Sequence, residues 1–417
     1  MAYIHVTGGK RLNGEVEIQG SKNASLPIIA ASLLINGVTR LEKCPKIVDV
    51  IHMTNILEAI GCKTYWEGST LVIDTSTLST STVPPEYVNK MRSSIIMMGA
   101  LIGRTNEVTI TYPGGCSIGA RPINFHLEAF RKMNISLTDV DGLIVCKTPE
   151  IIGNDITFKF PSVGATENTI LAAVLARGTT TINNAAKEPE ITDLCMFLNK
   201  AGAQISGYGT DTITIKGVSK LHEITYSISP DRIVTGTYIA AIASVGGNVT
   251  LKYTDCNILT NVIDLYRRIG CHIICRDDSI TINASGNPCA VDFIKTEPYP
   301  GFPTDMQSQT MAVLMSADGT SKISEEIFEK RFEIVKEFRK FGANIDINGR
   351  LATINGVSNL IGTEVYSKDL RGGAALVIAG LKAKGDTFIY NPEHIERGYE
   401  DICRDFRELG GQIQYVN

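Results

Sequence analysis

Two hydrophobic periods alternate along the chain. Residues 212–215 and 223–226 alternate apolar and polar positions, as half-buried strands do, and a further strand is predicted at residues 179–182. Residues 169–175 are apolar with helical spacing, and residues 192–201 have an amphipathic helical pattern that leads into a return strand. Strand and helix patterns that alternate in this way predict α/β units, in which helices cover a sheet.

The same unit recurs six times. Each copy has a helix that ends at a glycine and is followed by a short strand, and the copies lie about 70 residues apart. In the degenerate copy Asn134 replaces the glycine, and asparagine is the next-best residue for the left-handed conformation at a helix end. The other helix ends are predicted at Gly61, Gly202, Gly270, Gly342 and Gly410. This regular spacing indicates internal duplication.

The two ends of the chain complement each other. The last unit stops after residues 412–415 without a closing strand pair, whereas residues 3–19 predict strands with no preceding helix. We therefore expect the N-terminal strands to complete the C-terminal unit. The units then divide into two domains, one formed by residues 1–20 and 230–417 and the other by residues 21–229. Because the chain would cross between the domains twice, we expect a hinge, with the active site in the interdomain cleft.

Composition excludes several classes of protein. The 417 residues are 43% hydrophobic, enough for two or three cores, and the net charge of −4 argues against a binder of nucleic acid or of anionic membranes. Residues 1–6 have no charged leader or apolar segment, so we expect no signal peptide, and the most apolar run, residues 95–103, is too short to span a bilayer.

The 10 cysteines show no CxxC spacing, and Cys271 and Cys275 are the closest pair. No histidines flank that pair at zinc-ligand distances, so no metal site is predicted. Unpatterned cysteines in a chain of this size are typical of a reduced, cytoplasmic protein, in which we expect most thiols to be buried.

Cys116 is the exception, because it lies in the glycine-rich segment YPGGCSIGARP at residues 112–122. Glycines let the backbone approach a ligand closely, and Arg121 would favour the thiolate form of a nearby cysteine. The alternative interpretation is an ordinary glycine-rich turn around a packed cysteine.

Basic residues gather where the predicted helices begin. A helix N-terminus binds anions, but a cation there opposes the helix dipole at a cost of about 0.3–1 kcal/mol. We therefore expect an anionic ligand to compensate this set of cations, although each could instead pair with a neighbouring carboxylate: Lys22, Arg92, Arg331, Arg371 and Arg397. Asp305 begins another helix behind two prolines and a glycine, which suits a positioned general base, although a helix cap is the alternative.

These residues fall in motifs that resemble a known family, the UDP-N-acetylglucosamine 1-carboxyvinyltransferases, which are enolpyruvyl transferases. The resemblance runs along the whole chain and rests on GSKNASLP at 20–27, PGGCSIGARP at 113–122, PSVGATEN at 161–168, PYPGFPTDMQ at 298–307, FEKRF at 328–332, KDLRGG at 368–373 and ERGYED at 396–401. It implies an α/β fold, a two-domain inside-out α/β barrel of six βαβαββ repeats with three per domain. It implies no cofactor and no metal.

The resemblance also implies the reaction and its partners. The 3′-hydroxyl of UDP-N-acetylglucosamine would add to C2 of phosphoenolpyruvate, and phosphate would then leave, which begins the synthesis of peptidoglycan precursors. Both partners are small molecules, and neither nucleic acid nor membrane insertion is involved.

Roles are carried over by motif. Lys22, Arg121 and Arg397 would hold the phosphate, Arg331 and Arg371 the carboxylate, and Asn23 the reacting centre. Asp305 would take the proton of the 3′-hydroxyl, and Cys116 would deliver a proton to the methylene carbon and react with the epoxide fosfomycin. The nucleotide-sugar site would be lined by Arg92, Arg121, Pro122, Ile123, Asn124, Phe125, Ser162, Val163, Gly164, Asp305 and Ile327.

Asn124 departs from the family, many members of which have aspartate there, and this affects uridine recognition rather than the transfer chemistry. Two alternatives remain. The related enolpyruvylshikimate-phosphate synthases share the fold but lack the Cys116 loop. A catalytically silent paralogue that binds nucleotide-sugar would have no reason to keep Cys116, Asp305, Lys22 and Arg397.

Overall fold

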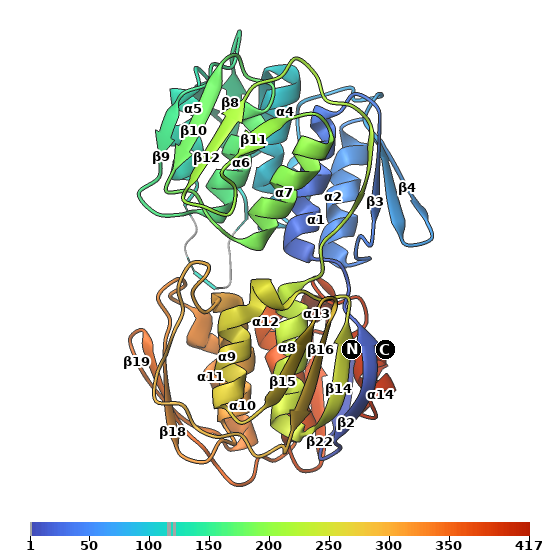
Figure 1. The fold of residues 1–417 in the computed structure, drawn as a ribbon, viewed down its shortest axis with the longest axis vertical. Helices are drawn as coiled ribbons and strands as arrows, with labels where there is room; N and C mark the ends of the chain where they lie inside the picture. The colour runs from blue at the N-terminus through green and yellow to red at the C-terminus, as the bar shows by residue number, and fades with distance from the viewer. Residues whose placement is uncertain (1, 115–117, 120–121) are drawn as a thin grey trace. The chain divides into compact units, whose positions relative to one another are not determined.

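The structure is a computed structural model that describes residues 2–114, 118–119 and 122–417 (Figure 1). The described residues form two compact units. Unit 1 contains residues 2–19, 118–119 and 230–417, and unit 2 contains residues 20–114 and 122–229. Among these residues, no helix has both the length and the apolar composition needed to cross a membrane.

Unit 2 contains three sheets. In spatial order they are β13 (Ile224–Ser227), β3 (Val38–Glu42), β5 (Thr70–Asp74) and β4 (Lys63–Glu67); β11 (Gln204–Ser206), β12 (Thr212–Lys216), β10 (Thr179–Asn183) and β9 (Asp155–Thr157); and β6 (Glu107–Thr111), β8 (Leu143–Lys147) and β7 (Ser136–Val140).

Unit 1 also contains three sheets. They are β15 (His272–Arg276), β16 (Ser279–Ala284), β14 (Gly247–Lys252) and β2 (Leu12–Glu17); β17 (Ile294–Lys295), β18 (Thr320–Ser324), β20 (Leu351–Asn355) and β19 (Asn344–Asn348); and β21 (Glu364–Tyr366), β22 (Asp386–Tyr390), β1 (Tyr3–Thr7) and β23 (Gln412–Val416).

All six sheets follow one plan, as the sequence repeats predict. In each four-stranded sheet one edge strand pairs in parallel with its neighbour, and the other pairs are antiparallel. In the three-stranded sheet a single parallel bridge between Thr82 and Thr109 takes the place of the parallel strand. The alternating pattern sets the register, since buried Ile182 lies opposite buried Ile213.

The strands predicted at residues 212–215 and 223–226 do not pair with each other, which corrects the expectation of a strand pair. β12 pairs within its own sheet, whereas β13 crosses to the sheet of β3. The chain ends behave in the same way. β1 pairs with β22 and β23 and so completes the last sheet, whereas β2 pairs in parallel with β14 of another sheet. Each repeat therefore gives its last strand to a neighbouring sheet, an exchange that local hydrophobic periodicity does not reveal.

The helices of unit 2 are α1 (Lys22–Ala31), α2 (Val48–Ala59), α3 (Pro85–Val88), α4 (Met97–Thr105), α5 (Asn124–Lys132), α6 (Val163–Ala173) and α7 (Pro189–Lys200), with 3₁₀ turns η1 (Ser32–Leu34) and η2 (Arg92–Ile96). Those of unit 1 are α8 (Arg232–Val245), α9 (Thr260–Arg268), α10 (Gln307–Leu314), α11 (Val335–Phe338), α12 (Leu370–Lys382), α13 (Glu393–Glu396) and α14 (Ile402–Glu408), with η3 (Cys256–Leu259), η4 (Thr304–Met306), η5 (Arg331–Ile334) and η6 (Arg339–Phe341).

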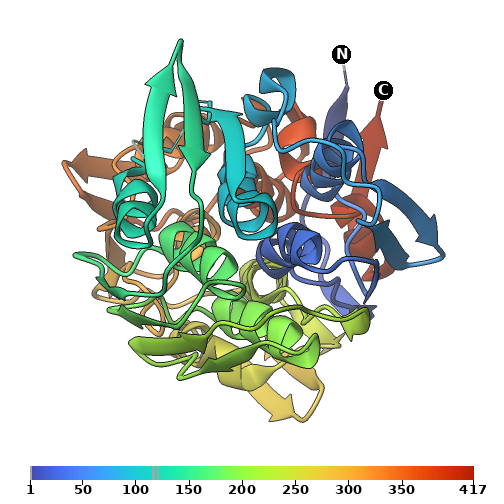
Figure 2. The same ribbon diagram turned by 90° about the horizontal axis from the view of Figure 1, so that it is seen from above.

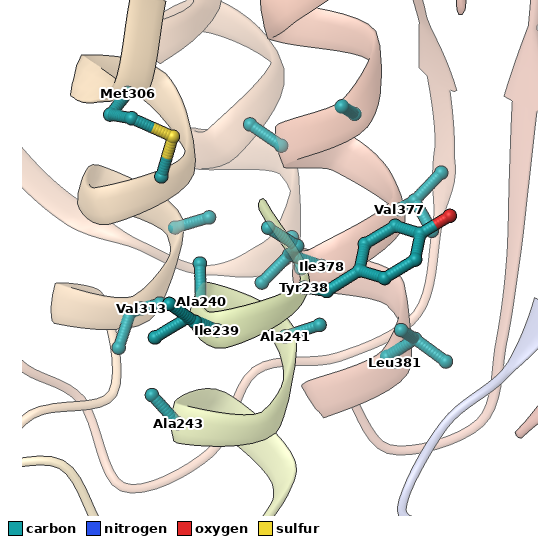
Figure 3. Packing of buried hydrophobic residues seen from close by; sticks show 14 of the residues in the cluster. Tyr238, Ile239, Ala240, Ala241, Ala243, Met306, Val313, Val377, Ile378 and Leu381 are labelled. Carbon is teal, nitrogen blue, oxygen red and sulfur yellow. The ribbon is translucent and has the colours of Figure 1, made fainter. Parts of the chain in front are cut away.

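Several helices are buried on almost every residue: α1 and α6 in unit 2, and α8, α10 and α12 in unit 1. A helix that is apolar on all sides lies in a core. In unit 1 the three buried helices contact one another, and Tyr238, Met306 and Val377 belong to the hydrophobic cluster around them (Figure 3). Figure 2 looks along the helices of unit 2, with strands outside them.

The predicted helix ends are confirmed. Gly61, Gly202, Gly270, Gly342 and Gly410 have φ angles between +89° and +108°, and Asn134 has φ +66°. This left-handed region is closed to most side chains but open to glycine and tolerated by asparagine. Each repeat therefore uses the same backbone device to turn from its second helix into the following strand.

Two cysteines correct the expectation of a fully reduced chain, because Cys256 and Cys275 form a disulfide with a Cα–Cα distance of 6.0 Å. Six other thiols are buried: Cys44, Cys62, Cys146, Cys195, Cys271 and Cys403. Burial raises the pKa of Cys62, Cys146, Cys271 and Cys403 to about 12, so these thiols stay protonated and unreactive at neutral pH.

Candidate active site

In unit 2, Lys22 is the first residue of buried helix α1. Ser21 caps the helix, its Oγ accepting from the Ala24 amide at 3.2 Å. The Lys22 ammonium is buried and lies 2.8 Å from the carboxylate of Asp49, which is completely buried in the first turn of α2. The cation therefore has a buried carboxylate partner on α2, and Asn23 follows it on the same helix, half-buried.

The predicted nucleotide-sugar residues of unit 2 lie at the start of separate elements. Arg92 begins η2, Asn124 begins α5, and Ser162 caps α6, with Val163 and Gly164 in the first turn of that helix. Pro122 and Asn124 are exposed, Ile123 is buried, and the ring of half-buried Phe125 lies 6.2 Å from that of Phe158.

A buried network that the sequence analysis did not find joins these elements. The Asn168 side chain accepts from the Gly99 amide at 2.7 Å and donates to the Ile95 carbonyl at 3.1 Å. The same amide lies 2.7 Å from Nδ1 of His126, and the His126 ring packs against Gly164. Asn168 thus holds α5, α6 and the η2–α4 segment together. Its place at the end of the PSVGATEN motif was the available signal.

In unit 1, Asp305 lies between two buried arginines. Nε and Nη2 of Arg371 donate to Asp305 Oδ2 at 3.1 and 3.0 Å, and Nη2 of Arg331 donates to Oδ1. The two arginine side chains are only 3% and 4% exposed, whereas that of Asp305 is 27% exposed. Asp305 therefore does not cap its own helix, and its carboxylate fills the space between two guanidinium groups.

Other residues of unit 1 hold Arg331 and Arg371 in place through hydrogen bonds. Nε of Arg331 donates to Thr304 Oγ1 at 3.2 Å, and that hydroxyl donates to the buried Glu325 carboxylate at 3.0 Å. Asp369 caps α12 by accepting from the amides of Arg371 and Gly372. Sequence reasoning named neither Thr304 nor Glu325, because their partners are distant in the chain.

Arg371 keeps its charge despite complete burial. Burial by itself disfavours the cation, but the nearby Asp305, Tyr399 and Asp231 outweigh it and raise the pKa of Arg371. Nη1 of Arg371 is buried and makes no hydrogen bond to any of the residues that the structure describes. A buried donor left without a partner costs free energy, so this nitrogen favours an additional acceptor such as a ligand oxygen.

Ile327 and Arg397 complete the predicted residues of unit 1. The Ile327 amide donates to Glu325 Oε1 at 2.9 Å, on the segment that leads to η5. Arg397 is the C-cap of α13 rather than the start of a helix, which corrects the sequence-based prediction. A cation at that end of a helix is favoured by the dipole, so this arginine needs no anion to offset a helix start.

The structure therefore brings Asp305, Arg331 and Arg371 into direct contact within unit 1. Within unit 2 it pairs Lys22 with the carboxylate of Asp49. Cys116 and Arg121 lie outside the described residues. No group of three or more His, Cys, Asp or Glu side chains suited to a metal ion occurs among the residues described. Chemically, unit 1 offers a buried pair of guanidinium groups that already holds one carboxylate.

Comparison with known proteins identifies the family. The family model for EPSP synthase (3-phosphoshikimate 1-carboxyvinyltransferase) matches residues 6–406. UDP-N-acetylglucosamine 1-carboxyvinyltransferase 2 of Caldanaerobacter subterraneus subsp. tengcongensis is 48% identical over 413 residues, which cover 99% of each chain. UDP-N-acetylglucosamine 1-carboxyvinyltransferase of Finegoldia magna is 44% identical over 420 residues, which cover 100% of this chain and 99% of that one.

Solved structures show the same fold. The enolpyruvyl transferase NikO from Streptomyces tendae superposes with a TM-score of 0.89 at 24% identity, over 100% of this chain and 99% of that one. EPSP synthase from Acinetobacter baumannii superposes with a TM-score of 0.76 at 16% identity, over 100% of both chains. The chain therefore belongs to the EPSP synthase family and, within it, to the UDP-N-acetylglucosamine 1-carboxyvinyltransferases.

Proposed function

We propose that this protein transfers the enolpyruvyl group of phosphoenolpyruvate to the 3′-hydroxyl of UDP-N-acetylglucosamine, with release of phosphate, as the first committed step of peptidoglycan precursor synthesis. The relatives named above carry this activity in their names. The observation that carries the proposal is the pair of buried guanidinium groups, Arg331 and Arg371, which holds a carboxylate between them.

The carboxylate of phosphoenolpyruvate would take the place of the Asp305 carboxylate between the two arginines. A guanidinium group matches a carboxylate with two parallel hydrogen bonds, and Nη1 of Arg371 supplies a further donor. At an effective dielectric constant of about 20, opposite charges about 4 Å apart attract by about 4 kcal/mol before desolvation is subtracted. Binding therefore exchanges one carboxylate for another and leaves the two arginines satisfied.

Displacement of the Asp305 carboxylate by that of phosphoenolpyruvate would free Asp305 to act as the general base. Once released from the arginines, its carboxylate accepts the proton of the sugar 3′-hydroxyl while the hydroxyl oxygen bonds to C2 of phosphoenolpyruvate. Cys116 gives its proton to the methylene carbon, which becomes a methyl group. The bond between C2 and the phosphate oxygen then breaks, and the Cys116 thiolate takes back a proton from the methyl group, which restores the double bond and the thiol. The proton on Asp305 is released with the phosphate. Lys22, Arg121 and Arg397 hold the departing phosphate, and Asn23 contacts the reacting centre.

The nucleotide-sugar would be held by residues from both domains, residues 1–20 with 230–417 and residues 21–229. The elements joined by Asn168 would supply Arg92, Asn124, Phe125 and Ser162 to Gly164, and unit 1 would supply Ile327. Pro122 and Ile123, which precede α5, would also line this site, as would Arg121, which lies outside the described residues. We further propose a cytoplasmic location, for which the acidic balance of the chain and the six buried thiols are the support.

Phosphate release tests the reaction. Purified protein with phosphoenolpyruvate is assayed with UDP-N-acetylglucosamine, with shikimate 3-phosphate, and with neither. We expect release only with the nucleotide-sugar. Release with shikimate 3-phosphate would instead assign the activity that names the matching family model. Binding of the nucleotide-sugar without release would indicate a silent paralogue.

A further inference from the structure

The chain passes from unit 1 to unit 2 at Gln19–Gly20 and passes back to unit 1 at Ser229–Pro230, and between these points residues 118–119 also belong to unit 1. The Gln19–Gly20 and Ser229–Pro230 crossings are tied to each other within each unit. In unit 1 the Asp231 amide donates to the Gln19 carbonyl at 3.0 Å, and in unit 2 the Ser21 amide donates to the Ser229 carbonyl at 2.8 Å. The backbone of Gln19 is therefore fixed at the point where the chain leaves unit 1.

The Gln19 side chain reaches the segment that follows Arg397. Nε2 of Gln19 donates to the Gly398 carbonyl at 3.1 Å, and Oε1 accepts from the Glu400 amide at 2.8 Å. These backbone groups lie between the end of α13 and the start of α14, where no helix supplies partners for them. One side-chain amide thus pairs with two backbone groups, as a neighbouring strand would.

The other side of this segment packs against α12, the helix that carries Arg371. Gly398 lies so close to the Leu370 side chain that an added Cβ would come within 2.7 Å of Leu370 Cδ2. Leu370 begins α12 and directly precedes Arg371. Tyr399 is buried, and its hydroxyl lies 2.8 Å from Thr237 Oγ1 on α8. The backbone around Arg397 is therefore fixed between the α12 start and the side chain of Gln19.

We propose that Gln19 is a positioning residue for the transfer reaction, which couples the chain crossing to Arg397 by holding the backbone at Gly398 and Glu400. The inference rests on the proposed function, in which Arg397 holds the phosphate of phosphoenolpyruvate. Gln19 itself contacts neither substrate. It fixes the backbone position from which the Arg397 side chain extends. A change at Gln19 should therefore weaken the binding of phosphoenolpyruvate and leave the binding of the nucleotide-sugar unchanged.

Gln19→Met tests the proposal, since methionine keeps the length of the side chain and makes neither hydrogen bond. We expect KM for phosphoenolpyruvate to rise about tenfold, the scale of a lost pair of hydrogen bonds, with KM for UDP-N-acetylglucosamine unchanged. Gln19→Glu keeps the acceptor for the Glu400 amide and loses the donor to the Gly398 carbonyl. Its KM for phosphoenolpyruvate should therefore lie between that of the unchanged protein and that of Gln19→Met. Gln412→Met, an exposed glutamine of β23 in the same unit, is the matched control and should change neither KM.

A double-mutant cycle separates positioning from a merely structural role. In an Arg397→Lys background, Gln19→Met should add much less than it does alone, because both changes act through the same guanidinium position. Full additivity, or an equal rise in both KM values, would overturn the proposal. If the unchanged protein releases no phosphate, the proposed function fails instead, and the two failures are thereby distinguished.

Discussion

Replacing Asp305 by asparagine tests whether this aspartate and the substrate carboxylate compete for the same two arginines. The carboxylate accepts three hydrogen bonds from Arg331 and Arg371, whose side chains are almost fully buried. Asparagine keeps the shape and one acceptor oxygen but loses the charge. The two buried cations would then lose the anion that they share and keep only the more distant Asp369 and Asp231, and removing one partner of a buried ion pair is costly.

The size of the effect follows from burial. Breaking a buried pair costs about 3–5 kcal/mol, and partial exposure of a partner reduces that figure through solvent screening. Because Asp305 is 27% exposed, we expect the free energy of unfolding to fall by about 2–3 kcal/mol. Turnover should fall by a factor of about 10²–10⁴, the usual contribution of a general base. Affinity for phosphoenolpyruvate should rise, because no aspartate has to be displaced.

Urea denaturation with and without phosphoenolpyruvate, together with calorimetric titration, measures these quantities. The ligand should stabilise the Asp305→Asn variant more than it stabilises the unchanged protein. Asp346→Asn, an exposed carboxylate on β19 of the same unit, provides the control. If affinity for phosphoenolpyruvate falls together with turnover, the aspartate helps to bind the substrate rather than occupying its place, and the displacement step is wrong.

Three further changes probe other parts of the molecule. Asp49→Asn leaves the buried Lys22 ammonium without its carboxylate, so urea denaturation should show a loss of about 3–5 kcal/mol, and an unchanged midpoint would contradict a buried pair. Cys116→Asp should keep turnover, since a carboxylic acid can also give a proton, and should resist fosfomycin in a time-dependent inactivation assay; complete loss of turnover would show that the thiol does more than donate a proton. Burial raises the pKa of Asp405, whose carboxylate accepts from the Tyr238 hydroxyl at 2.5 Å. The Asp405 carboxyl group therefore keeps its proton to a higher pH in the native state than in the unfolded chain. The native state then loses stability as the pH rises above the ordinary aspartate pKa of about 3.9. Asp405→Asn should remove that part of the decline in pH-dependent denaturation, and identical pH profiles would count against it.

Local features were predictable because each depends on residues that are close in sequence. The helix ends at Gly61 and Asn134 follow from backbone sterics, which act on a single residue. The six-fold repeat followed from the spacing of these helix ends, which recur about every 70 residues, and the structure has one sheet for each repeat. The motifs around Lys22 and Asp305 indicated the family, which the comparisons confirm.

Other features needed the folded chain. The predicted strand pairs separate into different sheets, because parallel partners such as β13 and β3 are brought together only by the intervening helices. Arg397 was placed at a helix start, but α13 ends there and a new helix begins at Ile402. Cys256 and Cys275 showed no motif, and they pair because the fold brings their Cα atoms to within 6.0 Å of each other.

The sequence by itself determined the repeated α/β unit, the residues that end its helices, and the family to which its motifs belong. The tertiary structure decided which charges meet. Asp305 contacts Arg371 across 66 residues, and the Gln19 side chain reaches Glu400 across 381 residues. The physical reason is that a hydrogen bond or ion pair depends on a separation of a few ångströms in space, and only the packing of the buried helices and their connecting segments brings residues so distant in sequence that close.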